Sequence, residues 1–266
     1  MYNFHTHTVY SDGKREPIEY VQYAISNGMD VLGFSDHSPV PFNSSWNMPV
    51  NKLNGYIGEI SRLKNEFSGI NIRLGLEVDY FDEFDAADAC GYDLSAFDYI
   101  IGAIHYLSPE GITVDSSKDE TDRLFYNEFH GDSKSFVSAY FTKYRNMLNA
   151  LKPNIAAHID LISKQNTGFC YYREDDKFFL DEFYKTLVKV KELGVFLEIN
   201  TGAISRGRDI IYPSQSLIGM VKDCDIPVLF NADAHTPQTL LCHFSEVEKI
   251  IRAFGLRKAD LSDIIK

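Results

Sequence analysis

The first thirteen residues, MYNFHTHTVYSDG (1–13), introduce the pattern that predicts the fold, a strand that ends in polar residues and a turn. Tyr2 and Phe4 are good strand formers, and the turn residues SDG close the segment. His5 and His7 are two positions apart, and such residues of a strand point to the same face. Their imidazoles are therefore expected side by side, at a spacing that suits one metal ion. Two structural histidines would give the same pattern.

The strand pattern recurs along the chain, with amphipathic helical segments in between. One predicted helix begins at Pro17 and is closed by NGMD (27–30), and others lie near 52–66, 134–151, 176–193, 214–223 and 245–254. The predicted strands are 2–7, 31–37, 72–80, 99–107, 155–160, 195–201 and 227–235. Seven buried strands joined by helices predict a parallel sheet. We therefore expect an α/β fold whose sheet closes, fully or nearly, into a TIM-like barrel.

Length and composition fit one barrel and narrow the function classes. The 266 residues suit a single domain over 1–266, and a net charge of −12 disfavours a protein that holds nucleic acid. Bound divalent cations would still permit an anionic substrate. No long apolar run or secretory signal is seen, so a cytoplasmic protein with no membrane partner is expected. The four cysteines lack CxxC pairing and are expected to be reduced thiols, and the oligomeric state stays open.

Residue types that bind metals gather where the predicted strands end. Six of the eight histidines and two carboxylates share this placement: His5, His7, His37, His105, His158, His235, Glu77 and Asp233. The C-terminal ends of barrel strands converge on one mouth, so these side chains are expected around a common centre. Imidazoles and carboxylates without thiolates suit zinc, iron or manganese. The set exceeds one tetrahedral site, which predicts two or three divalent metals with Glu77 as the best-placed bridge.

A centre of this kind indicates hydrolytic chemistry. Clustered divalent metals generate hydroxide at neutral pH and neutralise an anionic transition state, as in phosphatases and nucleases. We find no GxGxxG after a strand, no GxxxxGK[ST] and no GxSxG, which argues against nucleotide-cofactor and serine-hydrolase chemistry. Hydrolysis of a small-molecule phosphate ester is the leading interpretation.

Six segments, in this order, resemble the polymerase-and-histidinol-phosphatase (PHP) superfamily: HTHTVYSDG, SDHSP, GLEVDY, GAIHYL, AHIDL and NADAH. The stretches SDHSPVP, GLEVDYF with FDYIIGAIHYL, and LEINTGA with YPS are similar to its monofunctional histidinol-phosphatase branch. The resemblance covers essentially the whole chain. It implies a distorted seven-fold (β/α) barrel with a trinuclear metal site at the C-terminal ends of the strands.

The resemblance also implies residue roles. The implied ligand groups share Glu77 as a bridge and are His5, His7, Glu77 and Asp233; Glu77, His105 and His158; and Asp12, His37 and His235. The implied reaction is hydrolysis of L-histidinol phosphate, a late step of histidine biosynthesis, by a metal-bridging hydroxide. Glu77, Asp233 and His235 would be the catalytic residues. From the residues alone, Asp12 in SDG also fits an ordinary turn.

Other residues are candidates for substrate contacts. Arg206 is the predicted phosphate clamp and Arg208 the alternative, because guanidinium groups pair well with phosphate; a solvated loop arginine is the competing interpretation. Lys164 is a weaker phosphate candidate that fits a surface lysine better. Asn200 fits either a strand-end cap or support for a ligand. Trp46 is placed to cover an imidazole-bearing substrate.

The remaining polar candidates are expected to be structural. Asp36 and Asp160 alternate away from the adjacent ligands and fit backbone-orienting or capping roles. His130 is expected to be solvated and His243 peripheral. The irregular segments 38–50 and 108–132 follow strands two and four, so they are expected to lie over the mouth of the barrel.

Two alternative functions remain open at this point. The first is another PHP-type enzyme that acts on a different phosphomonoester or on nucleotides. The second is a metal-binding module without catalytic activity, which the complete ligand set disfavours.

Overall fold

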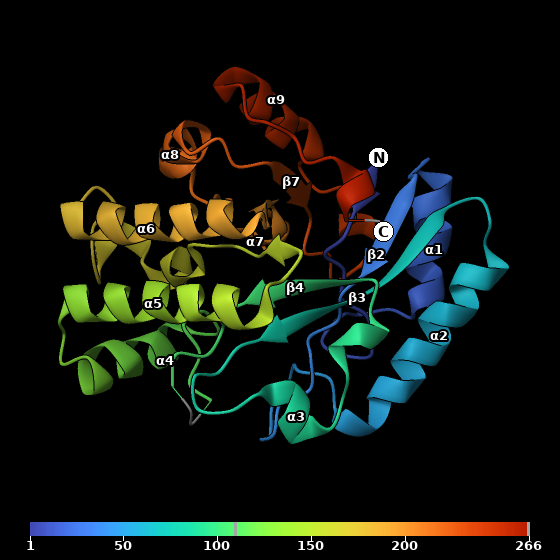
Figure 1. The fold of residues 1–266 in the computed structure, drawn as a ribbon, viewed down its shortest axis with the longest axis horizontal. Coiled ribbons are helices and arrows are strands. Elements are labelled where there is room, and N and C mark those ends of the chain that lie inside the picture. The colour runs from blue at the N-terminus through green and yellow to red at the C-terminus, as the bar shows by residue number, and fades with distance from the viewer. Residues whose placement is uncertain (109–110, 265–266) are drawn as a thin grey trace.

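A computed structural model describes residues 1–108 and 111–264, and over these residues seven parallel strands follow one another in chain order. Figure 1 shows the strands at the centre of the molecule with helices around them. The strands are β1 (Tyr2–Asn3), β2 (Val31–Phe34), β3 (Asn71–Asp79), β4 (Tyr99–Ala103), β5 (Ile155–Ala156), β6 (Phe196–Asn200) and β7 (Val228–Asn231). Each pairs in parallel with the next, which confirms the predicted α/β fold.

The segments that follow β1 and β7 close the sheet into a nearly closed barrel. Thr6 forms a parallel bridge with Ala234. The backbone N–H of His7 donates to the carbonyl of Ala234 at 2.8 Å, and the N–H of Ala234 donates to the carbonyl of His5 at 3.0 Å. The first and last strands therefore lie side by side, as a distorted seven-stranded TIM-like barrel requires.

The regular strands are shorter than predicted at their C-terminal ends. The prediction carried the first strand to residue 7 and the fifth to residue 160, whereas β1 ends at Asn3 and β5 at Ala156. The backbone leaves the ladder where side chains turn into the mouth. His158 and Asp233 there have positive φ values of 21° and 46°, a region that residues other than glycine seldom adopt. Such local strain is typical of functional positions.

Helices occupy most of the connections. They are α1 (Pro17–Ser26), α2 (Leu53–Glu66), α3 (Ala86–Cys90), α4 (Lys118–Arg123), α5 (Ser133–Leu151), α6 (Lys177–Leu193), α7 (Gly202–Ser205), α8 (Ile218–Asp223) and α9 (Phe244–Phe254). Pro17 occupies the first turn of α1, as predicted. Among the described residues, every helix is too short or too polar to span a lipid bilayer.

The prediction of an irregular segment over 108–132 was wrong in part. Residues 109–110 lie outside the described part of the chain, but α4 and a π-helix (Leu124–Glu128) occupy much of the remainder. The α4 sequence KDETDR has no apolar face, so periodicity gave no signal for it. Ser117 caps the helix by accepting a hydrogen bond from the backbone N–H of Glu120 at 3.2 Å.

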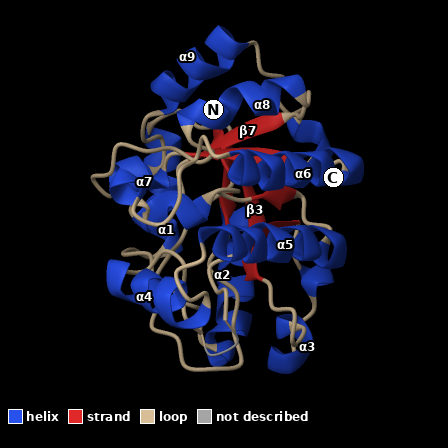
Figure 2. Ribbon diagram, turned by 90° about the vertical axis from the view of Figure 1, so that its left-hand side faces the viewer, coloured by secondary structure: helices blue, strands red, loops and turns tan. Residues whose placement is uncertain are grey.

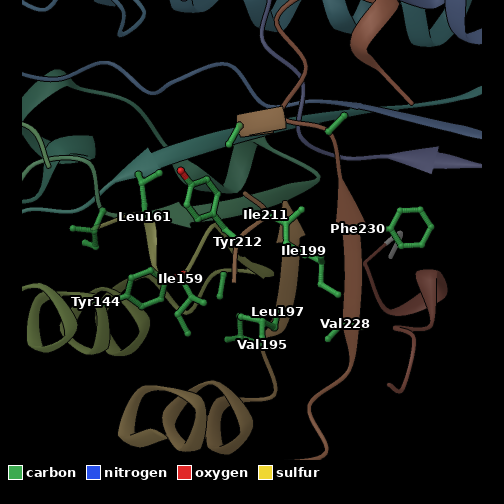
Figure 3. Close-up of a cluster of buried hydrophobic side chains, with 14 of the residues drawn as sticks. Tyr144, Ile159, Leu161, Val195, Leu197, Ile199, Ile211, Tyr212, Val228 and Phe230 are labelled. Atoms are coloured by element: carbon green, nitrogen blue, oxygen red, sulfur yellow. The ribbon is translucent and has the colours of Figure 1, made fainter. Parts of the chain in front are cut away.

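Apolar side chains fill both faces of the sheet. In Figure 3, Leu197 and Ile199 of β6 lie between Tyr144 of α5 on one side and Val228 and Phe230 of β7 on the other. Figure 2 shows helices covering the strands from the outside. A second buried cluster lies at alternate strand positions and therefore inside the barrel; it includes Phe4, Val31, Tyr99, Ile101, Ala103, Ile155 and Leu229.

Candidate metal centre

The C-terminal strand ends bring together the nine residues predicted as metal ligands. They follow or end six of the seven strands: His5, His7, Asp12, His37, Glu77, His105, His158, Asp233 and His235. Their side chains meet in the barrel mouth. His5 and His7 project side by side as predicted, with ring centroids 5.1 Å apart.

Glu77 is the centre of the arrangement. Its carboxylate is fully buried and lies within 4 Å of five imidazoles. Oε2 lies 3.2 Å from His5 Nε2 and 2.8 Å from His37 Nδ1, and Oε1 lies 2.9 Å from His158 Nε2. The backbone places it there because Glu77 forms a parallel bridge with His37 across β2 and β3.

Asp12 lies in a second part of the cluster. His235 Nε2 is 3.0 Å from Asp12 Oδ2, and both His7 Nδ1 and His37 Nε2 are 3.8 Å from Asp12 Oδ1. Ligand atoms of these four residues all lie within 4.8 Å of one another. Asp12 therefore faces the centre, and the turn in which it lies brings it there.

Two further groups of ligand atoms meet the same 4.8 Å spacing. The groups are His5, His7 and Glu77, and His37, Glu77 and His105. Glu77 belongs to both, as a bridging carboxylate would. Asp233 also faces the first group, because its Oδ1 lies 3.2 Å from His7 Nε2 and 3.9 Å from His5 Nε2.

Two buried carboxylates that the sequence analysis missed orient the histidines from behind. Glu198 Oε1 is 2.7 Å from His5 Nδ1, and Asp79 Oδ1 is 2.8 Å from His105 Nδ1. Each contact leaves Nε2 of the imidazole directed at the centre, an arrangement common around metal sites. Asn200 donates to Glu198 Oε2 at 2.9 Å and therefore supports His5 indirectly. A glutamate inside the apolar segment VFLEIN and the i, i+2 pair in LEVD were available signals.

The local electrostatics couple buried carboxylates to buried imidazoles. Burial and the neighbouring His37 and His235 lower the pKa of His7 to about 3. Burial opposes ionisation of Glu77, yet His5 and His37 hold its pKa well below its usual range. Burial also opposes protonation of His105, but Asp79 raises its pKa to about 9. Protons on imidazoles thus balance the carboxylates of the centre.

The donor set fits divalent metals. His5 Nε2, both ring nitrogens of His7 and Glu77 Oε2 are buried and make no hydrogen bond to the described residues. Buried polar atoms are normally hydrogen-bonded, so four such atoms within one cluster indicate a missing partner. Imidazole nitrogen and carboxylate oxygen are ligands for zinc, iron and manganese. The side chains can therefore hold metal ions that share Glu77.

A family model supplies independent support. The PHP domain model matches residues 3–202, which include every candidate ligand except Asp233 and His235. This chain belongs to the PHP domain family. The superfamily resemblance drawn from the six sequence segments is thereby confirmed.

Relatives of this PHP chain are similar over most of its length. A histidinol-phosphatase of Bacillus subtilis is 27% identical over 256 residues, covering 87% of this chain and 92% of the relative. A Listeria monocytogenes protein solved as a candidate histidinol phosphatase superposes with a TM-score of 0.79 at 22% identity, covering 92% of this chain and 99% of that one. The histidinol phosphate phosphatase of Lactococcus lactis, solved with zinc, L-histidinol and phosphate, gives a TM-score of 0.72 at 20% identity, covering 97% and 94%.

Beside the candidate ligands of this PHP chain lies a cavity of about 270 Å³. Beside candidate ligands it is lined by Trp46, Asp115, Ser116, Leu161, Lys164, Ala203, Arg206 and Tyr212. Arg206 Nη2 donates to Asp233 Oδ2 at 2.6 Å, which leaves other guanidinium donors available. Trp46 packs edge-on against His37 and His105, with ring centroids 4.5 and 5.1 Å away. Both residues therefore line the cavity.

The remaining candidates have structural contacts. Asp36 accepts hydrogen bonds from the backbone N–H groups of Thr8 and Ser11, at 2.8 and 3.0 Å, which confirms its backbone-orienting role. Asp160 accepts from the backbone N–H of Ser214 at 2.8 Å. Arg208 does not line the cavity but donates to the carbonyl of Lys164 and to Gln165 Oε1.

Lys164 lines the cavity and is largely buried, so the preferred interpretation of a surface lysine was wrong. The carbonyl contact from Arg208 holds its helical turn in place. His130 is exposed, and His243 is also exposed, at the start of α9, as expected for residues without a role in the centre.

Proposed function

We propose that this chain is a metal-dependent phosphomonoesterase that hydrolyses L-histidinol phosphate to L-histidinol and phosphate. The observation that carries the proposal is the buried Glu77 carboxylate with five imidazoles around it, open to a cavity that also contains a guanidinium group. The choice of substrate is inferred from relatives of similar length that are named histidinol-phosphatases. The cavity has room for a small phosphate ester.

The assigned ligands are the nine residues of the mouth, and the centre takes two or three divalent ions of zinc, iron or manganese. Bound there, such metals would lower the pKa of water and neutralise charge on the phosphate. Glu77 lies between the ligand groups and holds them at a fixed separation. Asp233 presents Oδ1 to His5 and His7 and Oδ2 to Arg206, so it aligns the guanidinium with the centre.

Arg206 would bind phosphoryl oxygens with the donors that Asp233 does not use. In the reaction, the oxygen of water forms a bond to phosphorus, the bond from phosphorus to the ester oxygen breaks, and the leaving alkoxide takes a proton. The proton that the attacking water loses balances the one that the alkoxide takes, and His235 lies beside the cavity with its Nε2 3.0 Å from Asp12 Oδ2 and its Nδ1 3.0 Å from the carbonyl of Asp233. Trp46 would cover the imidazole of the substrate.

The test is steady-state phosphate release from L-histidinol phosphate, p-nitrophenyl phosphate and a nucleoside monophosphate. The protein is freed of metal by chelation and reconstituted in turn with Mn²⁺, Zn²⁺ and Fe²⁺. The expected result is a kcat/KM for histidinol phosphate at least ~10³-fold above the other two esters, and loss of turnover without metal. Equal turnover on all three would leave a PHP phosphoesterase with another substrate. Metal binding without turnover would indicate the non-catalytic module.

Arg206→Met tests the phosphate clamp. Its kcat/KM is expected to fall ~10²-fold, because a charge-assisted contact to the phosphate is lost. Arg173→Met is the matched control, since Arg173 is an exposed arginine paired with Asp175 outside the cavity. Equal activity of the two variants would remove Arg206 from the site.

A further inference from the structure

One carboxylate in the cavity has no place in the metal cluster. Four carboxylates line the cavity among the described residues, and three of them, Asp12, Glu77 and Asp233, face the imidazoles of the cluster. The fourth, Asp115, lies in the segment between β4 and α4, and its side chain is 13% exposed. Any role of Asp115 in the site therefore depends on what it contacts within the cavity.

Asp115 is paired with a lysine that lines the same cavity. Lys164 Nζ lies 2.6 Å from Asp115 Oδ2, and the Lys164 side chain is 18% exposed. Lys164 belongs to the 3₁₀ helix η4 (Leu161–Gln165), which follows β5. Gln165 Nε2 donates to the backbone carbonyl of Asp115 at 2.9 Å, so a second contact fixes the two segments together. The pair is therefore held in place on both sides.

This carboxylate is unfavourable for the binding of a plain phosphate ester. Asp115 lines the same cavity as His105, His158 and Arg206, so its charge lies close to the groups assigned to the metals and the phosphate. Burial opposes its ionisation, but its partner Lys164 lowers its pKa, so it is negative at neutral pH. A buried negative charge repels a dianionic ligand unless the ligand carries a compensating positive group. Lys164 pairs with Asp115, so the two side chains together add no net positive charge for the phosphate.

We propose that Asp115 accepts a hydrogen bond from an ammonium group of the substrate and selects phosphate esters of 2-amino alcohols. On binding, the Asp115–Lys164 pair exchanges partners with a zwitterionic substrate, so that the ammonium group pairs with Asp115 and Lys164 turns to the phosphate. Histidinol phosphate has this chemistry, because its amine is on the carbon next to the ester carbon. The inference rests on the proposed phosphatase activity and identifies the group that reads the amine.

The experiment compares two substrate pairs that differ only in the amine. The first pair is L-histidinol phosphate and 3-(imidazol-4-yl)propyl phosphate, and the second is O-phosphoethanolamine and ethyl phosphate. The readout is the amine preference, defined as the ratio of kcat/KM between the members of a pair, measured on metal-loaded enzyme. The variants are Asp115→Asn, Asp115→Ser in case the first does not fold, and Lys164→Met. Asp122→Asn is the matched control, because Asp122 pairs with Lys118 at 2.7 Å on α4, outside the cavity.

The wild-type amine preference is expected to be at least ~50-fold, since a site built around a buried charge rejects a ligand that lacks the partner. Either substitution of Asp115 should reduce it below ~5-fold, and Asp122→Asn should leave it unchanged. Lys164→Met should lower kcat/KM on all four esters and keep the preference within ~3-fold. Equal losses on both members of a pair in the Asp115 variants, or no wild-type preference, would overturn the inference.

The proposed function can fail separately. If wild-type enzyme prefers O-phosphoethanolamine over ethyl phosphate, and Asp115→Asn abolishes that preference, Asp115 reads the amine whatever the natural ester is. Failure of histidinol phosphate to exceed O-phosphoethanolamine in the same assay would then refute only the histidinol assignment.

Discussion

The interior of the barrel has two adjacent layers, which we call the floor and the mouth. The floor is the buried cluster that includes Phe4, Tyr99 and Leu229, and the mouth holds the nine candidate ligands. The two layers differ in whether their buried polar atoms have hydrogen-bond partners. In β3, Gly75 faces the floor and Glu77, two residues later, faces the mouth. In the fourth repeat, Tyr99 lies in the floor and His105, just beyond β4, lies in the mouth. A few residues along each strand therefore separate a packing position from a candidate ligand.

The floor is complete without any partner. The Tyr99 ring fills the space that Gly33 and Gly75 leave, because a Cβ atom at either glycine would overlap it. Its hydroxyl donates to the carbonyls of Phe4 and Phe34, at 2.5 and 3.1 Å. Apolar packing and satisfied hydrogen bonds therefore hold this layer together.

The mouth leaves buried donor atoms unsatisfied. His5, His7 and Glu77 are as buried as the floor residues, yet several of their polar atoms make no hydrogen bond to the described residues. The difference teaches that burial alone does not identify a stabilising layer. Substitutions in the floor should change folding and spare chemistry, and substitutions in the mouth should do the reverse.

Glu77→Gln is expected to have the largest effect. The amide cannot bridge cations, and its NH₂ group would face imidazole nitrogens, so kcat/KM should fall at least ~10³-fold and metal content should drop. Thermal unfolding of the metal-free protein should change little, since removal of a buried charge offsets its lost contacts. Phosphate release, elemental analysis and calorimetry on one preparation provide the measurements.

The control for that substitution is Glu192→Gln, an exposed glutamate paired with Lys189. It should match wild type in all three assays. Unfolding of Glu77→Gln under conditions in which the metal-free wild type is folded would break the comparison, because the mouth would then be structural as well.

Gly75→Ala should give the next largest effect, on stability. The new methyl group would overlap the Tyr99 ring, and overpacking of this kind costs about 3 kcal/mol. Denaturant unfolding of metal-free protein measures the loss, and kcat/KM per folded molecule should stay within about two-fold of wild type. Gly58→Ala on α2 is the matched control, because nothing lies within 4 Å of its added Cβ, and it should be neutral or stabilising. A large loss of activity in folded Gly75→Ala would show that floor and mouth are coupled.

Glu198→Gln tests the support behind the mouth. Glu198 also accepts from the backbone N–H of His158 at 3.0 Å, so it orients two histidines at once. Metal affinity should fall ~10–100-fold, the range for residues that support ligands. Titration of metal-free protein with Zn²⁺ and Mn²⁺ measures this. Excess metal should restore activity here and fail to do so in Glu77→Gln; identical behaviour of the two variants would place Glu198 among the ligands.

The sequence predicted the mouth better than it predicted the layers around it. Ligand types repeat at strand ends, so His5, His37 and His105 could be recognised from their positions alone. Asp79 in LEVD and Glu198 in VFLEIN stand out as carboxylates in apolar segments, but the sequence does not say which histidine each one orients. The Asp115–Lys164 pair joins segments 49 positions apart, and no local pattern reports such a contact.

Strand bounds failed for a related reason. The strand-like pattern of residue types continues through AHID (157–160). The backbone nevertheless leaves the hydrogen-bonded sheet after Ala156, and His158 then points at the centre. Alternation of residue types reports burial, and it does not report whether hydrogen bonds of a ladder persist. The order of the strands and their parallel direction were nonetheless predictable, because helices separate them.

The smallest expected effect is a pH dependence confined to the mouth. Asp79 raises the pKa of His105 in the metal-free fold to about 9, against an ordinary value of 6.5. Between these values the folded chain binds more protons than the unfolded chain, so the free energy of unfolding should decrease as pH rises. The stabilisation is fully present below pH 6.5 and is lost as pH rises through 9, so the free energy of unfolding declines across this window.

Bound metal requires unprotonated imidazole nitrogens, so the metal-loaded protein should lack this decline. Asp79→Asn should flatten it in the metal-free protein, because the carboxylate that favours the imidazolium is gone. Urea unfolding at pH 6.5, 8 and 9.5, with and without Zn²⁺, measures both slopes. The floor carries the Tyr99 hydroxyl, whose pKa burial raises well above 10, so it adds little slope below pH 9. An equal decline in the metal-loaded protein would place the titrating group outside the mouth.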